Sequence, residues 1–280
     1  MVMECCVNHM FGQNEQRGIM KFTISSLFLT LMILLGLENP LLAEIRKFDK
    51  ATIEMLGVSI YEQDIRAASA TDMLFAKNID ILKEGLRGWV VEGDVKKRML
   101  VRFVREKDGL LEAFYDVSFV NKKEPVIEIP KNRKLTDSQV AQFKARLLAL
   151  SHITRPASRK YNIVILPDSG SDGFLVYALA ATTEPDKVMV GGHYRFTVSE
   201  SGDKIVKSDE LFLSFMELST KPEDLAPGAQ LSALYMTTMV SDMPLETHVY
   251  LSLLHRMTFY VGTPDKHVWK IQNGKMETVR

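Results

Sequence analysis

The chain has 280 residues, and its 35 basic and 35 acidic side chains give it no formal net charge at pH 7. A neutral chain lacks the dense positive surface by which proteins bind nucleic acid or anionic lipid, so we expect no nucleic-acid partner. Its only two cysteines are Cys5 and Cys6. The long remainder therefore excludes disulfides, thiolate metal sites and cysteine nucleophiles, and must rely on a hydrophobic core.

Residues 20–43 show the three parts of a secretory signal. Lys21 supplies a positive start, residues 22–37 form an uncharged apolar run, and Ala43 is a small residue at the expected cleavage point. The apolar run is shorter than the about 20 residues that span a bilayer, so an uncleaved membrane anchor is the weaker alternative. We predict export to the periplasm or the medium, with cleavage near Ala43 and a mature protein that starts near Glu44.

Residues 1–19 do not fit this signal, because they carry two glutamates where a basic start is expected. Residues 16–18, Gln-Arg-Gly, can be encoded by a purine-rich run of the kind that precedes a bacterial start codon. We therefore expect a bacterial sequence whose true start is Met20 and whose residues 1–19 are a mis-assigned upstream extension. Removing residues 1–43 leaves 33 basic and 32 acidic side chains, still near neutrality.

Residues 44–84 are predicted to form an N-terminal helical segment. Apolar and alanine residues recur there at helical spacings, and Ile60, Ile65 and Ala68 belong to this stripe. Thr71-Asp72 is expected to cap a second short helix. A buried carboxylate at Asp72 is the alternative, because this residue also continues the stripe.

From residue 85 to residue 280 we predict a body rich in antiparallel strands. Asp108-Gly109 between two apolar runs is a strong hairpin signal. The strands expected in the first part of the body are Trp89–Val91, Met99–Arg105, Leu110–Val120 and Pro125–Ile129.

Residues 136–151 are predicted to form a central amphipathic helix. Thr136 and Gln139 have the spacing of a capping box, in which each side chain bonds the backbone N–H of the other. The apolar stripe expected to pack on a sheet consists of Val140, Phe143, Leu147 and Leu150.

After Tyr161 the chain again alternates between apolar runs and turn residues. The predicted strands are Asn162–Leu166, Phe174–Ala181, Lys187–Val190, Tyr194–Val198, Lys204–Met216, Leu231–Val240, His248–Leu254, Thr258–Thr263, His267–Ile271 and Lys275–Val279. Together these elements predict an α+β fold: predominantly antiparallel sheets, N-terminal helices and one central helix packed on a sheet.

Residues 167–173 are predicted to be a polar hairpin turn. As a calcium loop the segment lacks oxygen ligands where Gly170 and Leu179 stand, and no reading frame in it gives the Gly-x-Ser-x-Gly pattern of a serine nucleophile. A zinc site is also disfavoured, because His248 and His255 are seven residues apart and would face opposite sides of a strand. We expect no metal and no cofactor.

The candidate site comes from strand alternation, because side chains in a strand point to opposite faces in turn. His193 and Arg195 share one face of their predicted strand, opposite Tyr194 and Phe196. In the run from residue 246 the residues opposite the apolar face are Glu246, His248, Tyr250 and Ser252. If the two strands are neighbours, His193, Glu246, His248 and Tyr250 are catalytic candidates, and Arg195 and Ser252 are ligand-binding candidates.

A solvated sheet face explains the same alternation without any site. The favoured function is therefore an exported, non-catalytic binding or envelope-associated protein whose partner is a protein, a glycan or a small ligand. The alternative is an acid–base enzyme, a hydrolase, that uses the polar face. Membrane contact is expected only through an uncleaved signal segment.

Overall fold

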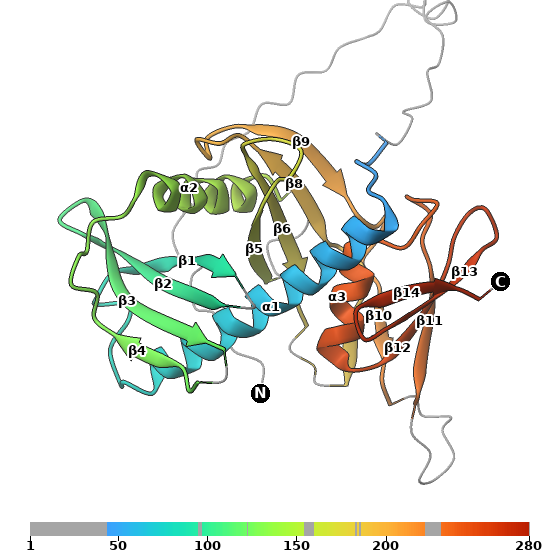
Figure 1. Cartoon of the computed structure of the whole chain (residues 1–280), viewed down its shortest axis with the longest axis horizontal. Coiled ribbons are helices and arrows are strands. Elements are labelled where there is room, and N and C mark those ends of the chain that lie inside the picture. The colour runs from blue at the N-terminus through green and yellow to red at the C-terminus, as the bar shows by residue number, and fades with distance from the viewer. Residues whose placement is uncertain are drawn as a thin grey trace, which may run out of the picture. The chain divides into compact units, whose positions relative to one another are not determined.

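The computed structural model describes residues 44–94, 97–121, 123–153, 160–182, 184, 186–221 and 231–279. The predicted upstream extension and signal segment, residues 1–43, lie outside these residues, and so do both cysteines. The described residues from Ile45 onward form one compact unit. Its described part has three helices and fourteen strands in four sheets, which confirms the α+β class (Figure 1).

Helix α1, Lys50–Phe75, begins where Asp49 accepts a hydrogen bond from the Thr52 backbone N–H, at 2.7 Å. The helix does not stop at Thr71-Asp72, so the predicted second helix is wrong. No proline or glycine interrupts the chain there, and the exposed Asp72 is a mid-helix residue whose carbonyl accepts from Ala76. The buried carboxylate considered for Asp72 is also wrong.

Sheet A is an antiparallel meander of β1 (Leu86–Asp94), β2 (Arg98–Lys107), β3 (Leu110–Val120) and β4 (Val126–Glu128). Asp108 and Gly109 form the predicted hairpin turn with positive φ values of 51° and 78°. One face of the sheet holds Val101 and Phe103 against Leu74 of α1.

Helix α2, Asp137–Ser151, has the predicted capping box: Thr136 accepts from the Gln139 N–H, and Gln139 accepts from the Thr136 N–H. Its buried face differs from the predicted stripe, because Leu147 and Leu150 are 50% and 40% exposed. Phe143 packs in a cluster with sheet A, while Ala145 and Ala149 pack on a second sheet, described next, through Val176 and Phe196. Small alanines allow the helix to lie close to the second sheet.

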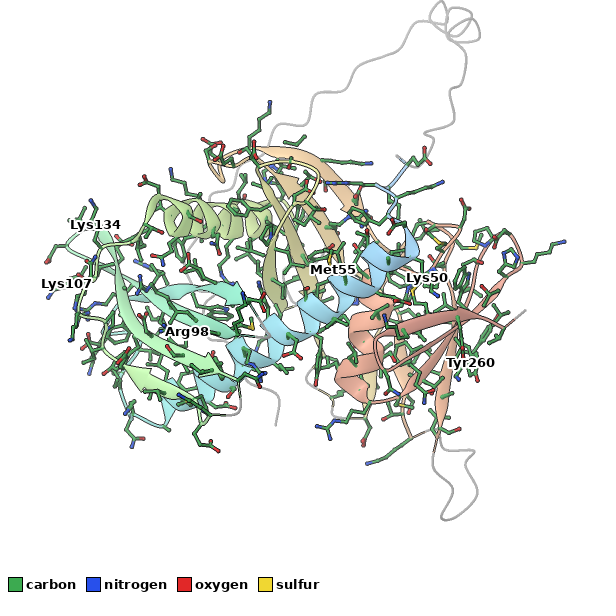
Figure 2. The ribbon with its side chains drawn as sticks, viewed as in Figure 1. Lys50, Met55, Arg98, Lys107, Lys134 and Tyr260 are labelled. Atoms are coloured by element: carbon green, nitrogen blue, oxygen red, sulfur yellow. The ribbon has the colours of Figure 1, made fainter. Side chains whose placement is uncertain are left out.

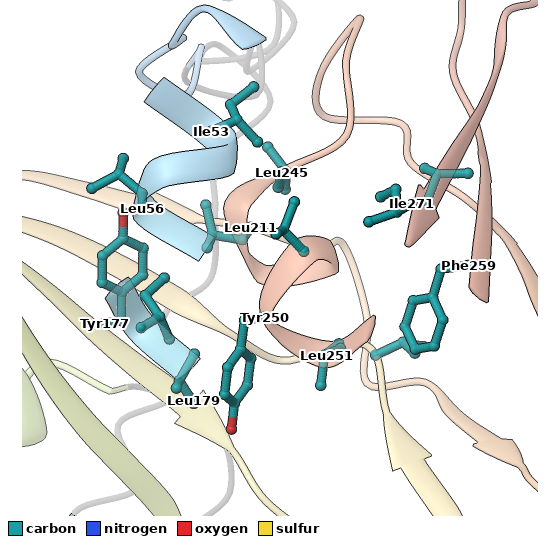
Figure 3. Close-up of a cluster of buried hydrophobic side chains, with 14 of the residues drawn as sticks. Ile53, Leu56, Tyr177, Leu179, Leu211, Leu245, Tyr250, Leu251, Phe259 and Ile271 are labelled. Atoms are coloured by element: carbon teal, nitrogen blue, oxygen red, sulfur yellow. The ribbon is translucent and has the colours of Figure 1, made fainter. Parts of the chain in front are cut away.

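Sheet B consists of the antiparallel strands β5 (Tyr161–Pro167), β6 (Phe174–Ala180), β8 (Tyr194–Val198) and β9 (Ile205–Glu210). One face, with Val176 and Phe196, packs on α2. The other face, with Tyr177 and Leu179, belongs to the largest apolar cluster, which also includes residues of α1 and α3 (Figure 3). Both faces of sheet B are therefore buried.

A two-stranded sheet and a third four-stranded sheet complete the unit. Strand β7 (Lys187–Met189) pairs with β10 (Glu217–Ser219). Sheet D contains β11 (Ala233–Thr237), β12 (Thr258–Gly262), β13 (Val268–Gln272) and β14 (Lys275–Thr278). Strands β11 and β12 are parallel, contrary to the expected antiparallel pairing throughout, because a helix crosses between them.

That crossover helix is α3, Glu246–His255, where the sequence analysis predicted a strand over residues 248–254. The prediction is wrong because every residue of α3 from Glu246 to Ser252 is buried. A helix buried on all sides has no exposed polar face, so its sequence lacks the helical spacing of apolar residues that would identify it. His248 accepts a hydrogen bond from the Leu245 backbone N–H at the start of the helix, and Arg256 ends it in the left-handed conformation.

The long helix α1 contacts α3 as well as strands of sheets A, B and D, so it joins the successive parts of the chain. Lys50 and Met55 lie on its exposed side (Figure 2). Within the described residues, no helix combines the length and apolar character that crossing a membrane requires.

Candidate functional site

The candidate site centres on Arg195 of β8, which lies against Glu246, the first residue of α3. Arg195 lies on the sheet face opposite Phe196, as strand alternation predicts, but that face is covered and Arg195 is 0% exposed. The solvated-face interpretation is therefore wrong for this residue. The cause is α3, which places Glu246, also 0% exposed, directly against the guanidinium group.

Each side-chain nitrogen of Arg195 has a hydrogen-bond acceptor. The Nε and Nη2 atoms donate to Asp209 Oδ2 at 3.0 and 2.7 Å, Nη1 donates to Glu246 Oε1, and Nη2 also donates to the Arg46 carbonyl oxygen. Burial lowers the pKa of Arg195, but the charges of Glu246 and Asp209 outweigh this effect and raise the pKa above its ordinary value. Arg195 is thus a permanently charged centre that two carboxylates neutralise.

Glu246 is the first residue of α3, where the helix dipole favours a negative charge. Tyr177 on β6 donates its hydroxyl to Glu246 Oε1 at 2.9 Å, the same oxygen that Arg195 uses. The second oxygen, Oε2, is buried and has no hydrogen-bond partner in the described part of the chain. Burial and the nearby Glu246 charge raise the pKa of Tyr177 well above its usual range, so the hydroxyl stays protonated.

The segment before α1 closes one side of this network. The Arg46 backbone N–H donates to Asp209, and the Arg46 guanidinium forms two hydrogen bonds to Asp168, at 2.7 and 2.8 Å. Burial raises the pKa of Asp168, but Arg46, the Gly170 N–H and the Ser171 hydroxyl outweigh it and lower the pKa to about 2. The turn at residues 167–173 therefore anchors the N-terminal segment.

A cavity of about 70 Å³ lies beside these groups. Arg195 and Glu246 form part of its wall, and the Phe48 ring faces both guanidinium groups, 4.7 Å from Arg195 and 5.0 Å from Arg46. Its remaining lining residues are Lys47, Ile53, Ser241, Asp242, Met243 and Leu245.

His193 does not join this network. Its Nδ1 accepts from the Ala180 N–H at 3.0 Å, and its Nε2 lies 3.1 Å from the Met189 carbonyl oxygen, which assigns the proton to Nε2. Burial lowers its pKa to about 4. Both ring nitrogens are occupied, so His193 is a satisfied core histidine.

His248 is also buried, and its Nδ1 accepts the Leu245 N–H at 2.8 Å. Burial, and secondarily the nearby His193, lower its pKa to about 3. The edge-on ring of Phe212 contacts both imidazoles, at centroid distances of 6.0 Å to His193 and 5.2 Å to His248. Both imidazoles are neutral at pH 7.

The last two sequence candidates bond elsewhere. Tyr250 donates to Asp64 of α1 at 2.8 Å, and Ser252 donates to the backbone oxygens of Met257 and Ile271. Of the six candidates, Arg195 and Glu246 are the pair joined by a hydrogen bond between their side chains. The structure adds Arg46, Asp168, Tyr177 and Asp209, which sequence reasoning missed because they lie far apart in the chain and share no motif.

Among the described residues, no group of three or more metal-ligating side chains is placed to hold an ion. Comparisons of this chain with protein-family models, with curated proteins and with solved structures find no match.

Proposed function

We propose that this chain is an exported, non-catalytic binding or envelope-associated protein, in which the Arg195 network organises a small binding cavity. The observation that carries this proposal is the burial of Arg195, His193 and His248, none of which is more than 1% exposed. Arg195 is saturated by acceptors, and both histidines have pKa values far below neutrality. Acid–base catalysis instead needs an accessible group whose pKa lies near the working pH.

Export is supported by the sequence pattern of residues 20–43. Expression of the chain from Met20 in a bacterial host, followed by fractionation and mass spectrometry, tests it. We expect a mature protein that starts at Glu44 in the soluble exported fraction. Ile33→Arg, which places a charge in the apolar run, is the control that should keep the precursor inside the cell. An intact Met20 in the membrane fraction of the unaltered protein would contradict cleavage.

A hydrolase is the second candidate, because the acidic side chain Glu246 and the cationic side chain Arg195 pair with each other and both residues line the cavity. Purified mature protein assayed with ester, peptide, glycoside and phosphoester substrates separates the two functions. We expect no turnover above the uncatalysed rate. Turnover that Glu246→Gln abolishes would overturn the non-catalytic proposal.

A further inference from the structure

We infer that one end of sheet A, formed by the β2–β3 hairpin and the turn at residues 80–85, docks on an anionic lipid bilayer with Leu82 and Leu110 inserted. This inference rests on the proposed function, because it names the partner of an envelope-associated protein. It is carried by the exposure of the leucines, by the strand register that brings them to one end of the sheet, and by the unpaired lysines of that end.

The first step is exposure. Among the described residues, the two most exposed large apolar side chains are Leu110, at 72%, and Leu82, at 68%. Leu110 follows Gly109 at the tip of the hairpin, where an added Cβ atom would meet no heavy atom within 4 Å. Apolar side chains that the rest of the chain leaves in water gain free energy when a partner covers them.

The second step is the register, which brings the leucines to the same end of sheet A. Leu111, beside Leu110, pairs with Glu106 of β2. On the other side of β2, the Glu106 N–H donates to the Gly85 carbonyl oxygen at 2.9 Å, and the Gly85 N–H donates to the Leu82 carbonyl oxygen at 3.1 Å. The turn with Leu82 and the hairpin with Leu110 therefore flank the same part of β2.

The third step is the charge of this end, which is positive although the whole chain is neutral. Residues 131–134 belong to it, because the Ala113 N–H at the start of β3 donates to the Arg133 carbonyl oxygen at 2.8 Å. Residues 80–87, 105–112 and 131–134 contain seven basic and five acidic side chains.

The charges left unpaired at this end are mainly ammonium groups. Four of the five acids form ion pairs with arginine or lysine residues of the same end: Asp80, Glu84, Glu106 and Glu112. Lys107, Lys131 and Lys134 are exposed and form no ion pair within the described residues, and Asp108 is the one acid left beside them. Figure 2 shows Lys107 and Lys134 at this end. An anionic bilayer offers headgroups to the lysines and acyl chains to the leucines.

Co-sedimentation of the mature protein with lipid vesicles tests the inference. A chain that starts at Glu44 lacks the apolar run of the signal segment, so that run cannot cause binding. We expect binding to mixed phosphatidylglycerol–phosphatidylcholine vesicles at low ionic strength, and at least tenfold weaker binding at high ionic strength or to phosphatidylcholine alone. No binding to the mixed vesicles, or equal binding to both kinds, would overturn the inference.

Leu82→Ser/Leu110→Ser should weaken binding to the mixed vesicles at least tenfold, because two inserted apolar side chains are lost. Met239→Ser, which changes a side chain 67% exposed after β11 of sheet D, is the matched control and should bind as the unaltered protein does. All three side chains are exposed, so the urea midpoints should stay unchanged. Equal binding by the double variant and the control would contradict insertion of the leucines.

Lys107→Ala/Lys134→Ala should weaken binding at low ionic strength at least tenfold, because two cations near the headgroups are lost. Lys204→Ala, at an exposed position before β9 of sheet B, is its control and should change little. The same loss in both variants would show that net charge, and not this end of sheet A, directs binding.

The orientation on the bilayer can be measured with a dye, because the mature chain contains no cysteine. An environment-sensitive fluorophore on Leu110→Cys should shift its emission to shorter wavelength with the mixed vesicles, and the same dye on Met239→Cys should not. Any other pattern would overturn the inference. The failures are distinguishable: absent vesicle binding leaves the non-catalytic proposal intact, whereas hydrolysis of soluble substrates overturns that proposal whatever the vesicles show.

Discussion

His193 and His248 are buried in an apolar environment that holds them neutral. Their pKa values of about 4 and about 3 lie below the ordinary histidine value of 6.5. As the pH falls below about 6.5, the unfolded chain takes up protons before the folded chain does. The stability that depends on these neutral rings is therefore present above about pH 6.5 and is lost progressively as the pH falls toward the folded pKa values.

Replacing His248 with Gln should flatten this pH dependence. A Gln side chain at the third helical position can still accept the Leu245 N–H, but it does not titrate. Between about pH 6 and pH 4 we expect the slope of unfolding free energy against pH to fall by about 1.4 kcal/mol per pH unit. Urea denaturation at several pH values measures it. An unchanged slope in His248→Gln would contradict the assignment.

Helices α1 and α3 approach closely at Gly57. A Cβ atom built there would lie 2.5 Å from Val249 Cβ and 2.8 Å from the Glu246 carbonyl oxygen. The missing side chain therefore sets the spacing of the two helices beside the network. The residue at this position is determined by packing, not by helix propensity.

Gly57→Ala should destabilise the protein by up to about 2 kcal/mol, because the overpacked contact costs about 1 to 3 kcal/mol and alanine regains about 1 kcal/mol of helix propensity. The midpoint of urea unfolding measures the effect. The double variant Gly57→Ala/Val249→Ala removes the nearest clashing atoms and should recover part of the loss. A more stable single variant would show that α1 and α3 are not in close contact.

The N-terminal segment at residues 45–48 connects sheet B, α3 and the turn at residues 167–173. Ile45 belongs to the main core, and Arg46 bonds Asp168, Asp209 and Arg195. These residues would stand at the very start of a mature protein cleaved near Ala43. The predicted cleavage point thus leaves the closing segment of the network attached.

A shortened chain that starts at Asp49 should be less stable than one that starts at Glu44 by about 3 to 5 kcal/mol. The shortened chain loses the burial of Ile45. Asp168 loses the Arg46 guanidinium as a donor, and Asp209 loses the Arg46 backbone N–H. Urea denaturation of both chains measures the difference. A chain that starts at Ile45 is the control and should lose less than about 1 kcal/mol. Equal midpoints for all three would refute a structural role for the segment.

The sequence predicted the features that depend on residues close together in the chain. The Thr136 capping box, the Asp108-Gly109 hairpin and the alternation that separates Arg195 from Phe196 all appear in the structure. Each depends on neighbours within a few residues, so turn chemistry, capping and strand period suffice.

Tertiary structure decided the rest. Residues 246–255 form a helix that the surrounding elements bury from Glu246 to Ser252. Such a helix has no polar face, and a polar face is the pattern by which a helix is recognised in a sequence. The same burial brings Glu246 to Arg195, and long-range folding brings Arg46 and Asp209 to join them. The sequence by itself thus determined the α+β class and the face on which Arg195 lies. Only the packed chain decided that this face is buried, because burial depends on contacts between residues far apart in sequence.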